Sequence, residues 1–281
     1  MHNSSHRGAV LISGASSGIG YSSALMLQQR GYRVFAGARR DEDLQRLRAL
    51  GLEAVALDLC DSAQIHAAAE QVLDATGGCL YGLFNNAGYG QPGAVEDLSR
   101  AALREQFETN LFGTMELTCA LLPAMRARGR GRIIQNSSVL GFAAMPYRGA
   151  YNASKFALEG ITDTLRLELR GSGIYVSLIE PGPIRSRFRE NSLAAFQRHI
   201  EPAGSAHEAA YERVLARLAS RTNNNRFALD ADAVGRCLIQ ALEATRPKIR
   251  YRVTTPTKAI AVLKRLLPAR ALDRLLGDVK E

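Results

Sequence analysis

The sequence predicts an α/β fold, a doubly wound parallel sheet within a single domain. Short apolar runs alternate with amphipathic stretches of helical length from residue 8 to about residue 180. That alternation is typical of βαβ units, whose parallel strands are covered by helices on both faces. A glycine-rich turn follows the first apolar run, and 46% of the 281 residues are hydrophobic, enough to bury one large core.

The elements are assigned in chain order. Strands are expected at residues 8–13, 32–37, 53–57, 80–85, 131–136, 174–179 and 249–253. Helices are expected from the glycine turn to residue 30, then at 41–50, 62–75, 101–128 and 150–170, and residues 185–219 are mostly helical in pattern. We expect the fold to occupy residues 1–255 and a basic, amphipathic helical extension to occupy 256–281. Right-handed crossovers would place a ligand at the carboxyl ends of the strands.

Charge and cysteine usage exclude several classes of protein. The net charge is +9, but residues 245–281 carry ten Lys and Arg against three Asp and Glu, so the rest of the chain is nearly neutral and nucleic acid is not an expected partner. Cys60, Cys119 and Cys237 lie in apolar segments, which suggests buried thiols in a reducing cytoplasm. No His and Cys share a metal-ligand spacing, so no metal site is expected. We identify no signal peptide and no membrane-spanning run.

The glycine-rich turn joins the first expected strand to the first expected helix. It reads Gly14-Ala15-Ser16-Ser17-Gly18-Ile19-Gly20. Backbone can approach a pyrophosphate closely only where side chains are absent, and a following helix N-terminus favours negative charge. The turn therefore predicts a dinucleotide site, the alternative being a tight turn that requires positive φ.

The end of the second expected strand bears on the choice of dinucleotide. An acid is expected there for the ribose of NAD, but the chain places Arg39 and Arg40 before the first acid, Asp41. Two guanidinium groups suit the 2′-phosphate of NADP, because Arg binds phosphate through two hydrogen bonds. The alternative is a pair of solvated arginines in an arginine-rich chain. NADP is therefore the expected cofactor, ahead of NAD.

Tyr151 and Lys155 form a second informative pair. Lys155 is the only lysine among the first 247 residues, which contain 26 arginines. It lies one helical turn after Tyr151, so both side chains fall on one face if this stretch is helical. A neighbouring ammonium can lower the pKa of a phenol and make it a proton donor and acceptor near neutral pH. Taken alone, the pair is also explicable by chance.

These segments together resemble the short-chain dehydrogenase/reductase family over about residues 8–255. The family's T-G-x-x-x-G-I-G appears from residue 13 with Ser13 for the first Thr, N-N-A-G is intact at residues 85–88, and Y-x-x-x-K runs from Tyr151 to Lys155. The P-G segment appears at residues 181–186, with Ser186 where Thr is commoner. The resemblance implies a Rossmann fold, hydride transfer between a nicotinamide and a carbonyl or alcohol carbon, and a homo-oligomer, either dimer or tetramer.

The resemblance also assigns catalytic roles. Tyr151 would be the general acid in reduction and the general base in oxidation, and Lys155 would lower its pKa and hold the nicotinamide ribose. Ser138, thirteen residues before Tyr151, would hydrogen-bond the substrate oxygen, while Ser137 is out of register. Asn110 would position a water between Lys155 and bulk solvent.

Cofactor contacts are expected from the glycine turn, the two arginines, the catalytic pair and the other family motifs. These residues are Gly14, Ser16, Ser17, Gly18, Ile19, Gly20, Arg39, Arg40, Asp58, Asn86, Ala87, Gly88, Tyr151, Lys155, Pro181, Gly182, Ile184 and Ser186. Asp58 matches the family's adenine-contacting acid, although a cap before the next helix explains it equally well.

Substrate is expected to meet the loops after the fourth and fifth strands and the segment after Pro183. Residues 89–95 and 140–147 are apolar and aromatic, without a charged group before Arg148, which favours a small hydrophobic carbonyl or alcohol. The expected contacts are Ser138, Leu140, Phe142, Met145 and Tyr151. The chain further resembles the retinol and 17β-hydroxysteroid dehydrogenase branch and its bacterial NADP-dependent aldehyde reductase relatives, which implies retinoid-like, steroid-like or long-chain aldehyde substrates.

Two questions stay open at the level of sequence. The basic segment from residue 257 could be a lid, a subunit contact, or a weak peripheral contact with the inner membrane surface. Other activities on the same fold are also conceivable: an epimerase or dehydratase, which needs polar sugar-binding loops, or an NADP-binding regulator without turnover. This chain lacks such loops and retains both Tyr151 and Lys155.

Overall fold

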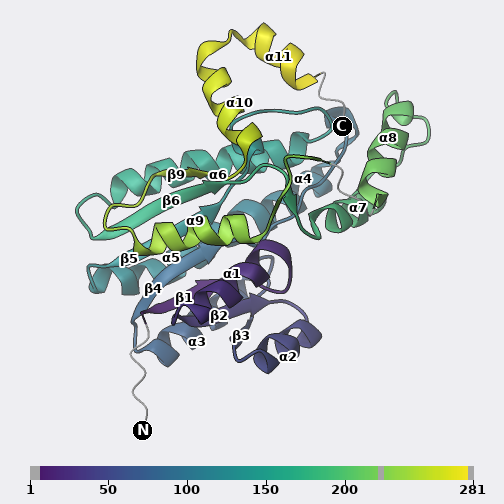
Figure 1. The fold of residues 1–281 in the computed structure, drawn as a ribbon. Helices are drawn as coiled ribbons and strands as arrows, with labels where there is room; N and C mark the ends of the chain where they lie inside the picture. Colours follow the sequence, from purple (N-terminus) through teal and green to yellow (C-terminus); the bar gives the residue numbers. More distant parts are fainter. Residues whose placement is uncertain (1–6, 221–224, 278–281) are drawn as a thin grey trace.

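The computed structural model describes residues 7–220 and 225–277. At its centre lies a seven-stranded, wholly parallel sheet in the order β3-β2-β1-β4-β5-β6-β9 (Figure 1). Its strands are β1 (Ala9–Ile12), β2 (Arg33–Ala38), β3 (Glu53–Ala56), β4 (Leu80–Asn85), β5 (Gly131–Asn136), β6 (Ile174–Glu180) and β9 (Arg250–Arg252). The parallel doubly wound sheet predicted from the sequence is confirmed.

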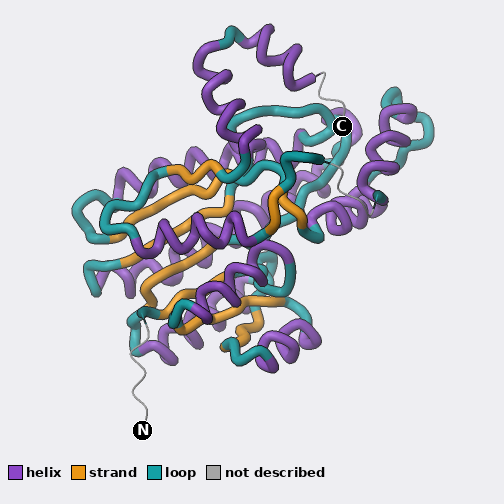
Figure 2. Tube along the Cα trace, viewed as in Figure 1, coloured by secondary structure: helices purple, strands orange, loops and turns teal. Residues whose placement is uncertain are grey.

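Helices cover both faces of the sheet (Figure 2). Alternate residues of β1 point to opposite faces, as the strand period of two requires. Val10 and Ile12 pack in the core beneath α1 (Gly18–Gln29), α2 (Asp41–Ala49) and α9 (Asp232–Glu243). Leu11 packs in the core beneath α3 (Ser62–Thr76), α5 (Gly113–Ala127) and α6 (Gly149–Glu168).

The strand order reverses between β1 and β4, which lie side by side at the centre of the sheet. The chain runs outward from β1 to β3 on one side and from β4 to β9 on the other. In open parallel sheets this reversal leaves a crevice at the carboxyl ends of the two central strands, where ligands bind. The glycine turn and the Asn85–Gly88 segment therefore meet at this position.

Element boundaries fall close to those predicted, with two differences. The expected helix 101–128 is instead α4 (Arg100–Phe107), a π-helical turn η2 (Glu108–Phe112) and α5. Its apolar pattern is nearly continuous, so periodicity did not reveal the wider turn. The amphipathic helix α9 was not predicted from the sequence, although it covers a large part of one face of the sheet.

The cysteine prediction was wrong. Cys60 and Cys119 are exposed, and Cys237 is half-buried. Cys119 occupies a solvent-facing position of α5, between the buried residues Leu117 and Leu121. An apolar neighbourhood in sequence therefore did not place these thiols inside.

Between β6 and α9 the chain forms elements at one end of the sheet. A two-stranded ribbon of β7 (Ile184–Arg185) and β8 (Leu229–Asp230) precedes α9, and α7 (Phe188–His199) and α8 (Glu208–Ala219) pack together above the strand ends. Helices α10 (Thr255–Leu266) and α11 (Ala269–Gly277) form an arm that projects from the body (Figure 1). None of the helices within residues 7–220 and 225–277 has the length and apolar character needed to cross a bilayer.

Candidate active site

The glycine turn between β1 and α1 leaves room for a ligand's phosphates. Gly14 has φ +67° and Gly18 has φ +54°, conformations that favour glycine. A β-carbon on Gly14 would lie 2.8 Å from the Cα of Ala87, and one on Gly20 would lie 2.3 Å from the Gly14 carbonyl. Ser17, the N-cap of α1, makes no side-chain capping bond, so the first-turn amides stay open to an anion. The turn therefore fits the pyrophosphate of a dinucleotide.

Polar side chains hold β1, β4 and β5 together beneath this turn. The Ser13 hydroxyl accepts hydrogen bonds from the backbone N–H of Asn86 at 3.0 Å and of Ala87 at 3.1 Å. Asn86 donates to the carbonyls of Ser13 and Gly14, and its own side-chain oxygen accepts from Asn136 Nδ2 at 3.0 Å. Asn86 thus links β1, β4 and β5 through hydrogen bonds beneath the crevice. Ser13 occupies the position where the family has Thr.

A polar cavity of about 200 Å³ opens at the end of β2. Arg39 is exposed there and has no ion pair with any described residue, whereas Arg40 is paired with Glu42 and Asp43, both at 2.9 Å. The cavity is lined by Ser16, Ser17, Arg39, Arg40, Asp43, Arg187 and Asn191. Of the two predicted guanidinium groups, Arg39 is the one free to meet a phosphate.

Arg46 was not singled out from the sequence, yet it connects this cavity to the glycine turn. Its guanidinium donates to the Ser16 carbonyl and lies 2.8 Å from the Asp43 carboxylate. Asp43 is buried and already shared by Arg40 and Arg46. The only carboxylate that lines the cavity is therefore neutralised.

Asp58 follows β3 and has a local structural role. Its side chain accepts a hydrogen bond from the backbone N–H of Cys60 at 3.0 Å, while Asp61 is the residue that caps α3. Such a turn holds the carboxylate at the carboxyl end of β3, near the edge of the sheet. The cofactor contact predicted for Asp58 stays a prediction.

The P-G segment joins the end of β6 to the glycine turn and the arm. The Pro181 carbonyl accepts from the backbone N–H of Val139 at 2.8 Å. A β-carbon on Gly182 would lie 2.2 Å from the Thr254 hydroxyl, and one on Gly18 would lie 3.0 Å from Cβ of Ser186. Ile184 begins the β7–β8 ribbon. The segment is therefore close to both the glycine turn and α10.

Tyr151 and Lys155 lie on the first two turns of α6, and both are buried. Lys155 Nζ donates to the carbonyl of Asn136 at 2.8 Å and lies 5.8 Å from the centre of the Tyr151 ring. The Ser138 hydroxyl accepts from the backbone N–H of Leu140 at 3.1 Å and also interacts with the Tyr151 phenol. The structure thus brings Ser138, Tyr151 and Lys155 together at the end of β5.

Asn110 reaches the same site from the π-helical turn η2. Its Nδ2 donates to the Tyr89 carbonyl at 3.0 Å and to the Ser154 hydroxyl at 3.1 Å, and its Oδ1 accepts from the Tyr89 N–H at 3.1 Å. A β-carbon on Gly88 would lie 3.0 Å from Asn110 Oδ1 and 3.8 Å from Lys155 Nζ. The wider helical turn, a feature often found at functional sites, places this amide inside.

An apolar cluster surrounds the Tyr151 ring. It consists of Val139, Leu140, Phe142, Met145, Tyr151, Phe188 and Ile260. The Phe188 ring packs edge-on against Tyr151, with ring centres 5.3 Å apart. Leu140, Phe142 and Met145 were predicted to meet substrate. Phe188 belongs to the segment after Pro183 that was also expected there, although it was not named, whereas Ile260 from α10 was not predicted.

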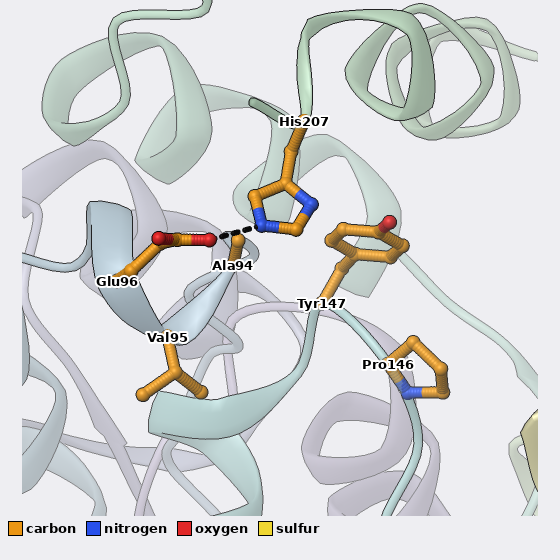
Figure 3. A pocket seen from close by; sticks show the side chains of 6 residues that line it. All are labelled: Ala94, Val95, Glu96, Pro146, Tyr147 and His207. Atoms are coloured by element: carbon orange, nitrogen blue, oxygen red, sulfur yellow. Dashed lines mark hydrogen bonds and ion pairs between the residues drawn. The ribbon is translucent and has the colours of Figure 1, made fainter. Parts of the chain in front are cut away.

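A second, more open cavity of about 500 Å³ lies between the two loops that were expected to bind substrate (Figure 3). Its walls are Ala94, Val95, Glu96, Pro146, Tyr147 and His207. The imidazole of His207 hydrogen-bonds the Glu96 carboxylate at 2.5 Å, so this cavity contains ionisable side chains that the apolar loops did not predict. Tyr147 has φ +57°, an uncommon conformation for a residue other than glycine.

The sequence model of the short chain dehydrogenase family matches residues 8–196. The chain belongs to this family. It is 45% identical over 269 residues, 95% of the chain and 93% of the relative, to an uncharacterized oxidoreductase, YbbO, of Escherichia coli K12. It is 34% identical to bovine retinol dehydrogenase 8, over 94% of the chain and 86% of the relative.

Solved structures of the family agree with the fold. A short-chain dehydrogenase/reductase from Burkholderia phymatum in complex with NAD is 26% identical, with a TM-score of 0.78 over 99% of this chain and 98% of the other. A short-chain dehydrogenase from Burkholderia cenocepacia in complex with NADP is also 26% identical, with a TM-score of 0.69 over 96% and 98%. The chain is therefore an oxidoreductase of a family whose members bind NAD or NADP.

Burial dominates the protonation of Tyr151 and Lys155. It raises the pKa of Tyr151 to about 12, with the Ser138 hydrogen bond acting in the opposite direction. It lowers the pKa of Lys155 to about 8, and the negative charge of Glu159 opposes this change. The expected lowering of the Tyr151 pKa by Lys155 is not seen in the protein alone, because Lys155 is directed to the Asn136 carbonyl rather than to the phenol.

Proposed function

We propose that this oxidoreductase uses NADP(H) to interconvert a hydrophobic aldehyde or ketone and its alcohol, with reduction as the direction in the cell. The observation that carries the choice of cofactor is the free guanidinium of Arg39 in a cavity whose only carboxylate, Asp43, is shared by two other arginines. A 2′-phosphate would complement Arg39 there, whereas the 2′-hydroxyl of NAD would find no free acid.

In this proposal each catalytic residue has a separate task. The nicotinamide, when bound, supplies or accepts the hydride. Tyr151 donates its phenolic proton to the carbonyl oxygen during reduction, and the raised pKa keeps that proton in place at neutral pH. Ser138 hydrogen-bonds the same oxygen as negative charge develops on it. Lys155 holds the ribose hydroxyls, and Asn110 connects it through a water to solvent.

The lining of the site supports an apolar substrate. Aromatic and aliphatic side chains surround Tyr151, and none of the cluster members carries a charge. The names of relatives such as retinol dehydrogenase 8 are consistent with a retinoid-like, steroid-like or long-chain aldehyde. The Glu96–His207 pair, at the neighbouring cavity, would suit a polar group at the far end of such a molecule.

A subunit contact is also proposed from the family resemblance. Phe112, the last residue of η2, is exposed at 50%, and Phe156 and Ile161 of α6 are exposed at 40% and 39%. Exposed apolar side chains that gather on neighbouring helices are typical of association surfaces. A homo-oligomer in the cytoplasm, either dimer or tetramer, agrees with this surface.

The proposal is tested by measuring the oxidation of NADPH and of NADH. NADPH and NADH consumption would be followed with a panel of long-chain aldehydes, retinals and ketosteroids, using the protein and its Arg39→Asp variant. We expect a higher kcat/KM with NADPH, and a loss of about tenfold or more for NADPH in the variant, because a bidentate phosphate contact is replaced by repulsion. NADH turnover should not fall.

Arg100→Asp is the matched control, since Arg100 is exposed on the first turn of α4, outside the cavity. Faster turnover with NADH than with NADPH would overturn the cofactor assignment. Binding of NADPH without oxidation by any carbonyl would favour a regulator over an enzyme.

A further inference from the structure

Helix α10 has one face that contacts the rest of the protein. Thr257 and Ala261 are buried, and Ile260 packs against the cluster around Tyr151. Lys264 donates a hydrogen bond to the Phe142 carbonyl and lies 5.2 Å above the Phe156 ring. These contacts fix the rotation of α10 about its axis, so the opposite face must point away from the body.

That outer face combines exposed apolar and basic side chains. Lys258, Val262, Arg265 and Leu266 follow one another at helical spacing and are all exposed, with Val262 at 54% and Leu266 at 73%. Helix α11 adds Leu275, exposed at 45%, together with the exposed arginines Arg270 and Arg274. We call these seven residues the arm surface.

Charge on the arm surface is uncompensated. Lys258, Arg265, Arg270 and Arg274 form no ion pair with residues 7–220 or 225–277, and Asp273 is the one acid of α10 and α11. A single exposed leucine requires no explanation. Three large apolar side chains among four cations that pair with none of the described acids are instead the pattern of a helix that lies on an anionic bilayer.

A second copy of the chain is a poorer occupant of this surface. A two-fold contact places the same patch against itself, so the cations of one copy would meet the cations of the other. We propose that the arm surface docks on the surface of an anionic lipid bilayer, with its apolar side chains entering the headgroup region. The contact is peripheral, because neither helix of the arm is long enough to span.

Docking there would also position the catalytic site. The inner face of α10 contacts the Tyr151 cluster through Ile260, so α10 would lie between the bilayer and the catalytic site. A hydrophobic substrate dissolved in lipid would then need to travel only a short distance. This consequence rests on the proposed function, whereas the docking itself does not.

The test is co-sedimentation of the full-length protein with vesicles. Pure phosphatidylcholine vesicles would be compared with vesicles that also contain phosphatidylglycerol, at low and high salt. We expect pelleting with the anionic vesicles and about tenfold weaker partition into the neutral ones, with added salt weakening the anionic binding. A double variant, Val262→Glu with Leu266→Glu, should lower the anionic partition by about tenfold or more, because charge replaces both inserted side chains.

Val95→Glu with Leu167→Glu is the matched control, since these residues are exposed at 76% and 47% on other elements. NADPH fluorescence and circular dichroism would verify that each variant is folded. The proposal is overturned if the unaltered protein stays in the supernatant with both vesicles, or if the arm variant pellets as well as the control. An altered oligomeric mass of the arm variant without vesicle binding would assign the surface to a protein contact instead. None of these outcomes depends on turnover.

Discussion

At the scale of single residues, burial shifts the pKa values of Tyr151 and Lys155, the proposed catalytic pair, in opposite directions. Tyr151 and Lys155 are both buried, and burial disfavours whichever form is charged. The pKa of the phenol rises to about 12, so the proton donor is retained, while that of the ammonium falls to about 8. Burial makes the charged form of Lys155 unfavourable in the protein alone. Hydrogen bonds to the ribose hydroxyls of a bound cofactor would favour that charged form.

Replacement of the phenol tests the role of Tyr151. Tyr151→Phe should lower kcat/KM for carbonyl reduction by about a hundredfold to ten-thousandfold, since the general acid is lost. The Kd for NADPH, measured by fluorescence titration, should stay within about threefold, because the ring and its packing against Phe188 are kept. Tyr175→Phe removes the hydroxyl of an exposed tyrosine near the amino end of β6, away from this site, and should leave turnover nearly unchanged. Full activity of Tyr151→Phe would disprove the assignment.

At the scale of elements, a partly buried ion cluster attaches the short edge strand β9 to α6 and β6. Arg250 contacts Glu159 at 3.0 Å and Asp163 at 2.6 Å on α6, and Glu180 at 3.0 Å on β6. Burial raises the pKa of Glu159 to about 6 despite the Ser137 hydroxyl and Arg250 beside it. Glu159 lies one turn after Lys155, so the cluster also holds the helix that carries the catalytic pair.

Loss of the Arg250 guanidinium should lower the stability of the folded protein. Arg250→Met should lower the free energy of unfolding by about 2–3 kcal/mol at pH 7.5, because Glu159 would stay buried without its cationic partner, whereas Glu180 would keep Arg252. Arg250 is 28% exposed, so solvent offsets part of the cost. Protonation of Glu159 removes the buried charge, and loss of Arg250 raises the pKa of this carboxyl further, so the loss of stability should shrink as the pH falls from 7.5 toward about 6.

Urea denaturation at pH 7.5 and pH 5.5 would measure both effects. Arg185→Met is the control, since its pair with Asp230 is exposed at 51% and 75% and should contribute little. Equal stabilities of the two variants would show that the cluster does not hold β9.

At the scale of the whole molecule, the burial of Lys155 lowers the stability of the fold at neutral pH. Lys155 is charged in the unfolded chain up to a pKa near 10.5 but only to about 8 in the folded protein. Below pH 8 folding must therefore bury a charge, and stability rises with pH between about 8 and 10.5, where the unfolded state binds more protons.

Lys155→Met should remove that cost. We expect the free energy of unfolding to increase by about 1–3 kcal/mol at pH 7, less than the pKa shift alone implies because the hydrogen bond to Asn136 is lost. Turnover should be abolished at the same time. The gain should fade as the pH rises from 8 toward 10, in urea denaturation at several pH values. The exposed Lys248→Met should show neither effect, and a less stable Lys155→Met at pH 7 would contradict the argument.

The sequence by itself determined the strands, the glycine turn, the spacing of Ser138, Tyr151 and Lys155, and through them the family. These features depend on local periodicity and short motifs, which can be recognised in the sequence without knowledge of the fold. Only the tertiary structure separated Arg39 from Arg40, inserted a π-helical turn at Asn110, and brought Phe188 and Ile260 onto Tyr151. It also showed that burial raises the pKa of the Tyr151 phenol, which Lys155 was expected to lower. Ion pairing, burial and contacts between distant elements depend on which segments pack together in the fold. Local sequence patterns do not contain that information.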